Sequence, residues 1–348
     1  HMEFSNDIFS AMDFHTGEIP SRKKTIIRKD PQIRVDERRL YQQNGVSTCT
    51  IFVSLRNPLD NAELSSLTKT VKVLPLTQAS DEFAKAPLLF SEYCITSFPE
   101  LLKLQLAANK EKSLLTGMEH TEIVGYQNSS VNDIVSEVGC IYRAIHNTCD
   151  ITYSNPMNST ELVQNVRLPD VVLKTTLGTC LDLAILFCSA LLQVGLHPIL
   201  LLMENHAFCG CFLHEYDSFS GLYESKPNVV YSDALSEEKN LILFECTTVC
   251  NSFSVPFSEA MKMGQENLRA YRGFFAAVDV YRAQTSIFKP IPIPDEKGTI
   301  DFKVPFVKLN PEELEDINQY QGTPIPESDT NDRFSTWEKK LLDLSNAN

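Results

Sequence analysis

The sequence lacks the features that mark several large protein classes. It has 13 glycines among 348 residues and no glycine-rich phosphate loop of the P-loop or dinucleotide type. It also has no internal repeat and no low-complexity tract. With 43% hydrophobic and 22% charged residues, its composition excludes collagen-like, coiled-coil and wholly disordered proteins. We therefore expect a globular protein that does not hydrolyse ATP by itself.

Basic residues are in the minority. The chain has 31 Lys and Arg residues against 45 Asp and Glu, which gives a formal net charge of -14 at neutral pH. Such a surface repels phosphate backbones unless the basic residues gather on one face. This balance disfavours direct nucleic-acid binding by this chain.

A disulfide-rich composition, a leader sequence and a membrane-length apolar run are missing too. Ten cysteines are too few for a small disulfide scaffold in a chain of this length. The chain begins without the basic, apolar and small-residue pattern of a signal sequence. Its most apolar stretch, residues 181–203, is broken by polar residues and by Pro198, so we expect a buried helix and strand there. These observations predict a cytoplasmic protein with reduced thiols and no membrane partner.

The length favours two domains, or one domain with a large extension. A β-rich start is indicated by apolar residues that alternate from Cys49 to Leu55, with turn residues such as Gly45 and Pro58 on either side. The predicted division is a cloning remnant and tail (1–21), a small β-rich, sandwich-like domain (22–126), the main domain (127–294), an extended polar linker (295–335) and the cut start of a following helical region (336–348).

Apolar spacing predicts the elements of the main domain. An amphipathic helix over residues 131–145 is expected to be capped by Ser129 or Ser130. Residues 97–106 fit neither the helical nor the strand period, so both alternatives remain open there. A buried helix is expected over 180–194, strands at 198–203, 206–213 and 241–248, a helix near 258–271 and a strand near 274–281, with an acidic loop over 215–240 that borders the cleft.

Cys180 stands at the start of the predicted buried helix, where free N–H groups and the helix dipole favour a thiolate. His206 opens a predicted strand, and an imidazole beside the thiol can accept its proton and later return it. Glu245 lies in an otherwise apolar strand, where an unpaired carboxylate would be costly and a histidine partner would explain it. These three residues are the candidate catalytic triad.

This constellation resembles the transglutaminase-like branch of the papain-type cysteine proteases and acyltransferases. The residues that carry the resemblance are the run Gly178-Thr179-Cys180-Leu181-Asp182, the His206 strand and the acid of the following strand. The resemblance implies an α+β fold in which the cysteine helix packs on an antiparallel sheet, and catalysis through a thioester. The family usually has Asp as its third member, whereas Glu245 stands here.

A second resemblance covers about residues 127–294. The chain is similar to the N-terminal region of large bacterial superfamily-one helicases that carry a transglutaminase-like segment before the motor. In that family the next element begins with a Trp and a Leu-Leu-Asp-Leu run, as at Trp337 and residues 341–344. The resemblance implies that the partner is a C-terminal helicase and nuclease region of the same protein, in defence against foreign DNA. Its motifs lie at Gly125-Tyr126-Gln127, Ile151-Thr152-Tyr153, Gln164 to Pro169, His206-Ala207-Phe208 and Ala277 to Val280.

Further polar residues are candidates for supporting roles. The backbone N–H of Cys180 is expected to form half of an oxyanion hole, with Gln164 or, alternatively, Asn205 as the other half. Arg167 is a candidate for holding a substrate carboxylate, or for an ion pair with Asp182 or Asp279, both of which are expected to give structural support. Asp182 is expected to brace the loop before Cys180.

Four cysteines raise the question of a metal site. Two short cysteine pairs on neighbouring strands resemble a tetrahedral thiolate set, although Cys-x-Cys is tighter than the usual Cys-x2-Cys knuckle. Alternation places Cys209 and Cys211 on the strand face opposite His206, so we interpret them as core thiols. We expect no metal and no cofactor. The four residues are Cys209, Cys211, Cys246 and Cys250.

Two functional hypotheses follow from the sequence. The leading one is a cysteine-dependent amide-bond hydrolase, a protease or deamidase, that acts on a protein or peptide through Cys180, His206 and Glu245. Water as the acyl acceptor gives hydrolysis and an amine gives transamidation. The alternative is a catalytically silent module of the same fold that docks a partner protein or regulates an attached motor.

Overall fold

The structure is a computed structural model of the whole chain. Residues 1–300 contain one compact unit, to which all the described residues belong. The predicted linker over 295–335 and the helical start over 336–348 lie outside the described residues. The structure describes residues 1–11, 33–43, 45–80, 87–127, 130–155, 163–219, 229–230, 240–251, 255–270, 273–286, 288–291 and 293.

The described residues combine helices with antiparallel sheets, which confirms the α+β class. The strands are β1 (Met2–Phe4), β2 (Phe9–Ala11), β3 (Ile33–Val35), β4 (Ser47–Arg56), β5 (Glu63–Val73), β6 (Gln78–Ser80), β7 (Thr152–Tyr153), β8 (Val163–Asn165), β9 (Leu177–Gly178), β10 (Pro198–Met203), β11 (Ala207–Phe212), β12 (Val229–Val230), β13 (Leu241–Phe244) and β14 (Phe274–Asp279). The helices are α1 (Glu37–Tyr41), α3 (Pro99–Thr116), α4 (Val131–Thr148), α5 (Pro169–Thr175), α6 (Cys180–Gln193), α8 (Phe257–Ala270) and α9 (Val280–Ser286), with 3-10 turns at Pro87–Tyr93 and Thr247–Val249.

A five-stranded sheet forms the centre of the first unit, with strand order β12-β14-β10-β11-β13 and antiparallel pairing throughout. β10 and β11 are buried along their whole length, and their sequences, PILLLM and AFCGCF, are almost entirely apolar. Strands that are covered on both faces need such continuous apolar runs. The register places Leu201 opposite Phe208, so the turn between these two strands carries His206.

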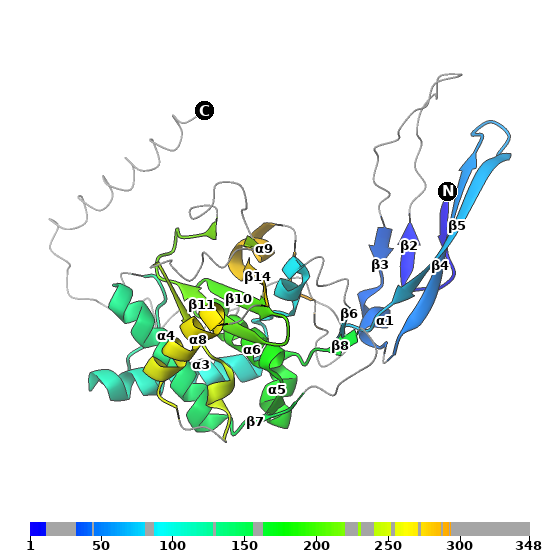
Figure 1. Cartoon of the computed structure of the whole chain (residues 1–348). Helices are drawn as coiled ribbons and strands as arrows, with labels where there is room; N and C mark the ends of the chain where they lie inside the picture. Colours follow the sequence, from blue (N-terminus) through cyan, green and yellow to red (C-terminus); the bar gives the residue numbers. More distant parts are fainter. Residues whose placement is uncertain are drawn as a thin grey trace, which may run out of the picture. The chain divides into compact units, whose positions relative to one another are not determined.

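Helix α6 packs on β10 and β11 (Figure 1). Its residues 180–191 are all buried, because Leu, Ile, Phe and Ala occur on every side of the helix. Helices α3 and α4 pack against each other and against α6. Helix α4 begins after Ser130, whose hydroxyl accepts the N–H of Asp133, so Ser130 is the cap of the two predicted alternatives. Residues 97–106, left open by the sequence, belong mainly to helix α3.

The N-terminal part contains a three-stranded antiparallel sheet, in the order β1-β4-β5, and the short pair β2-β3. The long hairpin of β4 and β5 confirms the alternating strand predicted from Cys49 to Leu55 (Figure 1). The prediction of a tail over residues 1–21 is wrong for β1 and β2. Met2 pairs with Val53, and Phe9 pairs with Val35, so backbone hydrogen bonding extends into this segment.

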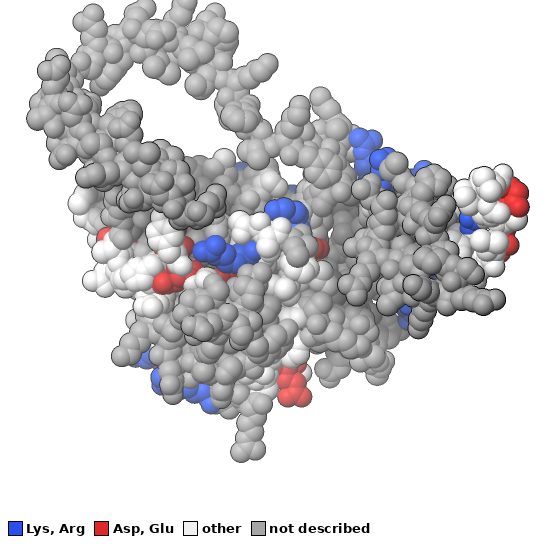
Figure 2. All heavy atoms as spheres, turned by 90° about the horizontal axis from the view of Figure 1, so that it is seen from above, with Lys and Arg blue, Asp and Glu red and all other residues white. Residues whose placement is uncertain are grey.

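The charged side chains of the described residues are dispersed on the face drawn in Figure 2, where Lys and Arg are separated by acidic and uncharged residues. A basic patch of the kind that binds phosphate backbones is not visible among the described residues of that face. Among the helices that the structure describes, none has both the length and the apolarity needed to cross a membrane.

Two glycines give a test of the packing between the segment that precedes α4 and the end of α6. Gly125 has φ +61°, and a Cβ there would lie 2.5 Å from the carbonyl oxygen of Val194. Gly117 has φ +69°, and nothing lies within 4 Å of its Cβ position. We expect Gly117→Ala to lower the free energy of unfolding by about 1 kcal/mol through backbone strain alone. Gly125→Ala should lower it by about 3 kcal/mol because the clash adds to the strain. Urea denaturation measures both, and equal losses would contradict the close approach.

Candidate active site

Cys180 is the first residue of α6, and the local sequence builds a complete cap before it. Thr179 is the N-cap, and its hydroxyl accepts the N–H of Asp182 at 3.3 Å, while the Asp182 carboxylate accepts the N–H of Thr179 at 2.9 Å. This reciprocal capping box fixes the direction in which the chain enters the helix. Cys180 is 6% exposed, at the end of the helix where the dipole favours negative charge.

Arg167 completes the support of this helix start. Its guanidinium Nη1 lies 2.9 Å from Oδ2 of Asp182, and its backbone N–H donates to Oδ1 at 2.8 Å. The buried Asp182 carboxylate therefore accepts three hydrogen bonds, one from the Arg167 guanidinium and two from backbone N–H groups. Of the alternatives for Arg167, the structure has the ion pair with Asp182. Asp279 lies elsewhere, opposite Ile199 at the far end of β10, where its carboxylate accepts the N–H of Arg282 at 3.0 Å.

His206 and Glu245 meet across two neighbouring strands. His206 directly precedes β11, and Glu245 directly follows β13, which pairs with β11. The His206 Nε2 atom lies 2.7 Å from Oε2 of Glu245. An ionised carboxylate can only accept hydrogen bonds, so Nε2 carries a hydrogen, and the ring also forms a hydrogen bond with Cys180. The side chains of His206 and Glu245 are 16% and 3% exposed, which shields their interaction from water.

The Glu245 carboxylate accepts hydrogen bonds from Thr247 and Asn267 as well as from His206. Oε1 accepts the backbone N–H of Thr247 at 2.9 Å and its hydroxyl at 2.7 Å. Oε2 also accepts the side-chain N–H of Asn267, on α8, at 2.6 Å. Neither Thr247 nor Asn267 was predicted from the sequence. Thr247 could have been, because a threonine two residues after an acid can donate to its carboxylate. Asn267 is distant in sequence, and no local pattern connects it to Glu245.

His206 and Glu245 shift each other's pKa values. Burial lowers the pKa of His206, but hydrogen bonds with Cys180 and Glu245 and the charges of both groups outweigh it and raise the pKa to about 10. Burial raises the pKa of Glu245, and the hydrogen bonds and positive charge of His206, together with Thr247, outweigh it, so the net direction is downward. Both directions favour an imidazolium paired with the Glu245 carboxylate.

Tyr153 is a fourth residue beside the thiol. It ends β7, which pairs with β9 so that Tyr153 lies opposite Gly178, just before the Thr179 cap. Burial, with the charge of Cys180 and a hydrogen bond to its thiol, raises the pKa of Tyr153 to about 12. Its phenol therefore stays neutral at neutral pH and can donate a hydrogen bond to the Cys180 sulfur.

The two predicted oxyanion candidates have different positions. Gln164 lies on β8, where its backbone pairs with Ala79 of β6, and its side chain lies outside the described residues. Asn205 is exposed in the turn between β10 and β11. The part of the predicted acidic loop from residue 220 to residue 239 lies outside the described residues, apart from β12.

The core cysteines lie below this site. Cys209, Cys211, Cys246 and Cys250 are all buried, and Cys188 of α6 lies 3.6 Å from Cys209, sulfur to sulfur. Burial raises the pKa of Cys211 to about 12 and that of Cys246 to about 11, so these thiols stay protonated and unreactive. Within the described part of the chain, no three His, Cys, Asp or Glu side chains are grouped closely enough to hold a metal ion.

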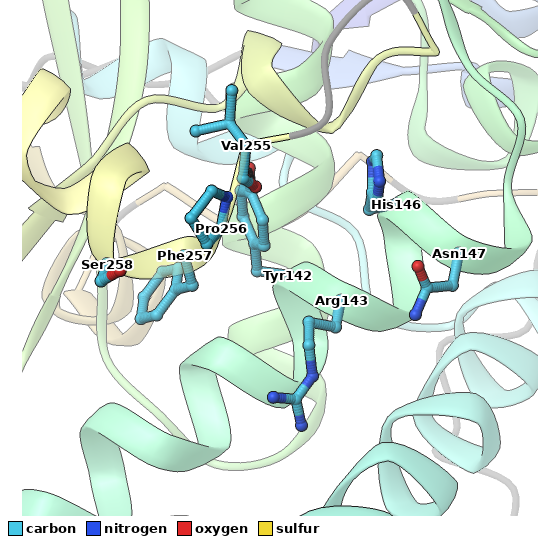
Figure 3. A pocket seen from close by; sticks show the side chains of 8 residues that line it. All are labelled: Tyr142, Arg143, His146, Asn147, Val255, Pro256, Phe257 and Ser258. Atoms are coloured by element: carbon cyan, nitrogen blue, oxygen red, sulfur yellow. Dashed lines mark hydrogen bonds between the residues drawn. The ribbon is translucent and has the colours of Figure 1, made fainter.

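A separate pocket of about 530 Å³ lies between α4 and the start of α8 (Figure 3). Arg143 on its wall is already paired with Glu111 at 3.0 Å, and Tyr142 donates to Thr248 or the Val255 carbonyl, both at 2.9 Å. None of Cys180, His206 and Glu245 lines it. Its walls are Tyr142, Arg143, His146, Asn147, Val255, Pro256, Phe257 and Ser258.

Comparison of the chain with protein-family models, curated proteins and solved structures finds no match.

The paired charges predict how the stability of the protein varies with pH. The pKa of His206 is raised in the folded protein, so its stabilisation is fully present below the unfolded value near 6.5 and is lost as the pH rises toward about 10. We expect the loss of unfolding free energy in His206→Gln to be largest at about pH 6 and to shrink as the pH rises to about 9. Urea denaturation of both proteins across this range measures the difference. A difference that is constant or grows with pH would contradict the charged pair.

Proposed function

We propose that this chain is a cysteine-dependent amide-bond hydrolase with a transglutaminase-like, papain-type core. The observation that carries the proposal is the 2.7 Å hydrogen bond between His206 and the buried Glu245, beside a cysteine at a capped helix start. A structural histidine does not require a buried carboxylate partner in the core. A catalytic histidine gains from one, because an anion stabilises the imidazolium that forms during the reaction.

The mechanism follows from the three positions. His206 takes the proton from Sγ of Cys180, and the thiolate attacks the carbonyl carbon of an amide. The Cys180 backbone N–H stabilises the developing oxyanion, since it is one of the free donors of the helix N-terminus. The tetrahedral intermediate collapses to a thioester, and His206 returns its proton to the leaving amine or ammonia.

Water then completes the cycle. His206 removes a proton from water, the resulting hydroxide displaces the thiolate from the thioester, and a carboxylic acid is released. Glu245 stays ionised throughout and stabilises the imidazolium at each half-reaction. An amine in place of water gives transamidation. We favour hydrolysis of a protein or peptide, as a protease or deamidase, within a cytoplasmic helicase and nuclease protein that defends bacteria against foreign DNA.

A docking module is a second candidate, and the exposure of the N-terminal hairpin favours it. Leu59, Leu64 and Leu67 are 93%, 64% and 66% exposed on β5 and the β4-β5 turn. Exposed apolar side chains of this kind often mark contacts with other proteins. A docking module keeps its partner when Cys180 is changed to Ala, whereas an enzyme loses its activity.

Selective alkylation tests the proposed chemistry. We expect limiting iodoacetamide to label Cys180 first, with a rate at about pH 5.5 that stays within several-fold of the rate at about pH 8, because the thiolate is paired with an imidazolium. His206→Ala should lower the rate at the acidic pH by at least about tenfold. Peptide mapping after intact-mass measurement identifies the labelled thiol.

Cys149 supplies the internal control. It is the described cysteine that is not fully buried, and burial raises its pKa. Its labelling should therefore fall steeply at acidic pH in both proteins. Equal reactivity of Cys180 and Cys149 at every pH, unaffected by His206→Ala, would overturn the proposed function.

A further inference from the structure

Helix α8 makes three contacts with the end of β13, all from one face. The carbonyl of Ala260 accepts the backbone N–H of Glu245 at 2.9 Å, and Asn267 donates to the Glu245 side chain at 2.6 Å. Between them, a Cβ at Gly264 would lie 2.6 Å from the N and Cα atoms of Phe244. Positions i, i+4 and i+7 share one helix face, so this face is shaped to hold Glu245.

We propose that Asn267 is a positioning residue of the triad, through which α8 holds the Glu245 carboxylate toward His206. This inference rests on the proposed function and adds to it a residue outside the triad of Cys180, His206 and Glu245. Asn267 donates to the Glu245 carboxylate and acts on His206 through it.

The carboxylate has two differently supported oxygens. Oε1 is served locally by the N–H and hydroxyl of Thr247. Oε2 accepts from His206 at 2.7 Å and from Asn267 at 2.6 Å. Without Asn267, the oxygen that faces the imidazole would have His206 as its one donor among the described contacts. A buried carboxylate with fewer donors takes up a proton more readily, and a neutral Glu245 cannot stabilise the imidazolium.

Gly264 makes this contact possible. Any larger residue there would push α8 away from β13 and carry Asn267 out of hydrogen-bond range, since it lies less than one turn further along the helix. Glu245 has a longer side chain than the Asp of the resembling family. Its carboxylate is fixed from two sides, by Thr247 and by Asn267 of α8.

The surroundings of Glu245 leave His206 as the group that sets its ionisation. Burial raises the pKa of each neighbouring phenol and of Cys246 and Cys250, so these groups are neutral near neutral pH. His206 is the remaining partner. The titratable groups that face Glu245 are His206, Tyr142, Tyr153, Cys246 and Cys250.

The test uses a proton NMR signal that does not require catalysis. In the Cys180→Ala protein, the His206 Nε2–H that donates to Glu245 should give a strongly downfield signal, which is lost when the carboxyl is protonated at acidic pH. In Asn267→Leu, which has a similar size and no donor, we expect the midpoint of this loss to lie higher by about one pH unit. In the parent protein with Cys180, the acidic limb of the alkylation rate should move in the same direction.

Two further variants keep the test decisive. Gln265→Leu makes the same chemical change on an exposed position of α8 and should leave the midpoint unchanged. Asn267→Asp keeps the side-chain shape, so it serves if Asn267→Leu does not fold, and it should raise the midpoint further because two carboxyls cannot both ionise at this distance.

The outcomes separate this inference from the proposed function. The positioning role of Asn267 is overturned if Asn267→Leu and Asn267→Asp leave the midpoint of the Cys180→Ala protein unchanged. It is also overturned if no downfield signal exists at any pH. If the midpoint shifts but Cys180 shows no His206-dependent reactivity, the role of Asn267 stands and the proposed hydrolase function fails.

Discussion

A buried carboxylate organises the centre of this protein. Glu245 is 2% exposed, and an ionised group in such a place is stable only if donors replace the lost water. His206, Thr247 and Asn267 supply those donors from three segments of the chain. The strand order, the approach of α8 and the turn before β11 are each arranged so that these donors reach one side chain.

The same arrangement brings three remote segments into one site. Cys180 begins α6, His206 precedes β11 and Glu245 follows β13. α6 packs on β11 and β11 pairs with β13, so the three residues belong to elements that are in direct contact with one another. The thiols of Cys188 and Cys209 touch beneath the site, within the packed core that joins the cysteine helix to the histidine strand. Packing of this kind is rigid enough to keep reacting groups in register.

The sequence predicted the elements of the main domain more completely than the site. Strong apolar periods located α4, α6 and β10 because burial dictates residue type along a whole element. Cys180 was predicted from its place at a helix start and His206 from its place at the start of a strand. Glu245 was predicted because a carboxylate in an apolar strand needs a partner. Asn267 lies at the edge of the face of α8 that packs on β13, and an asparagine in an amphipathic helix gives no sign of such a contact. Its partner is known only when the tertiary packing of α8 on β13 is known. The strands at the N-terminus were missed because β1 and β2 are three residues long.

The most direct test of the account is the capture of a covalent intermediate on Cys180. Rapid mixing with p-nitrophenyl acetate should give a burst of p-nitrophenolate of about one equivalent, with an acetyl group on the Cys180 peptide that disappears as water hydrolyses the thioester. The burst should be absent in Cys180→Ala and strongly slowed in Glu245→Gln. Acetylation that is confined to other residues, or that is equal in all three proteins, would contradict a thioester mechanism at this site.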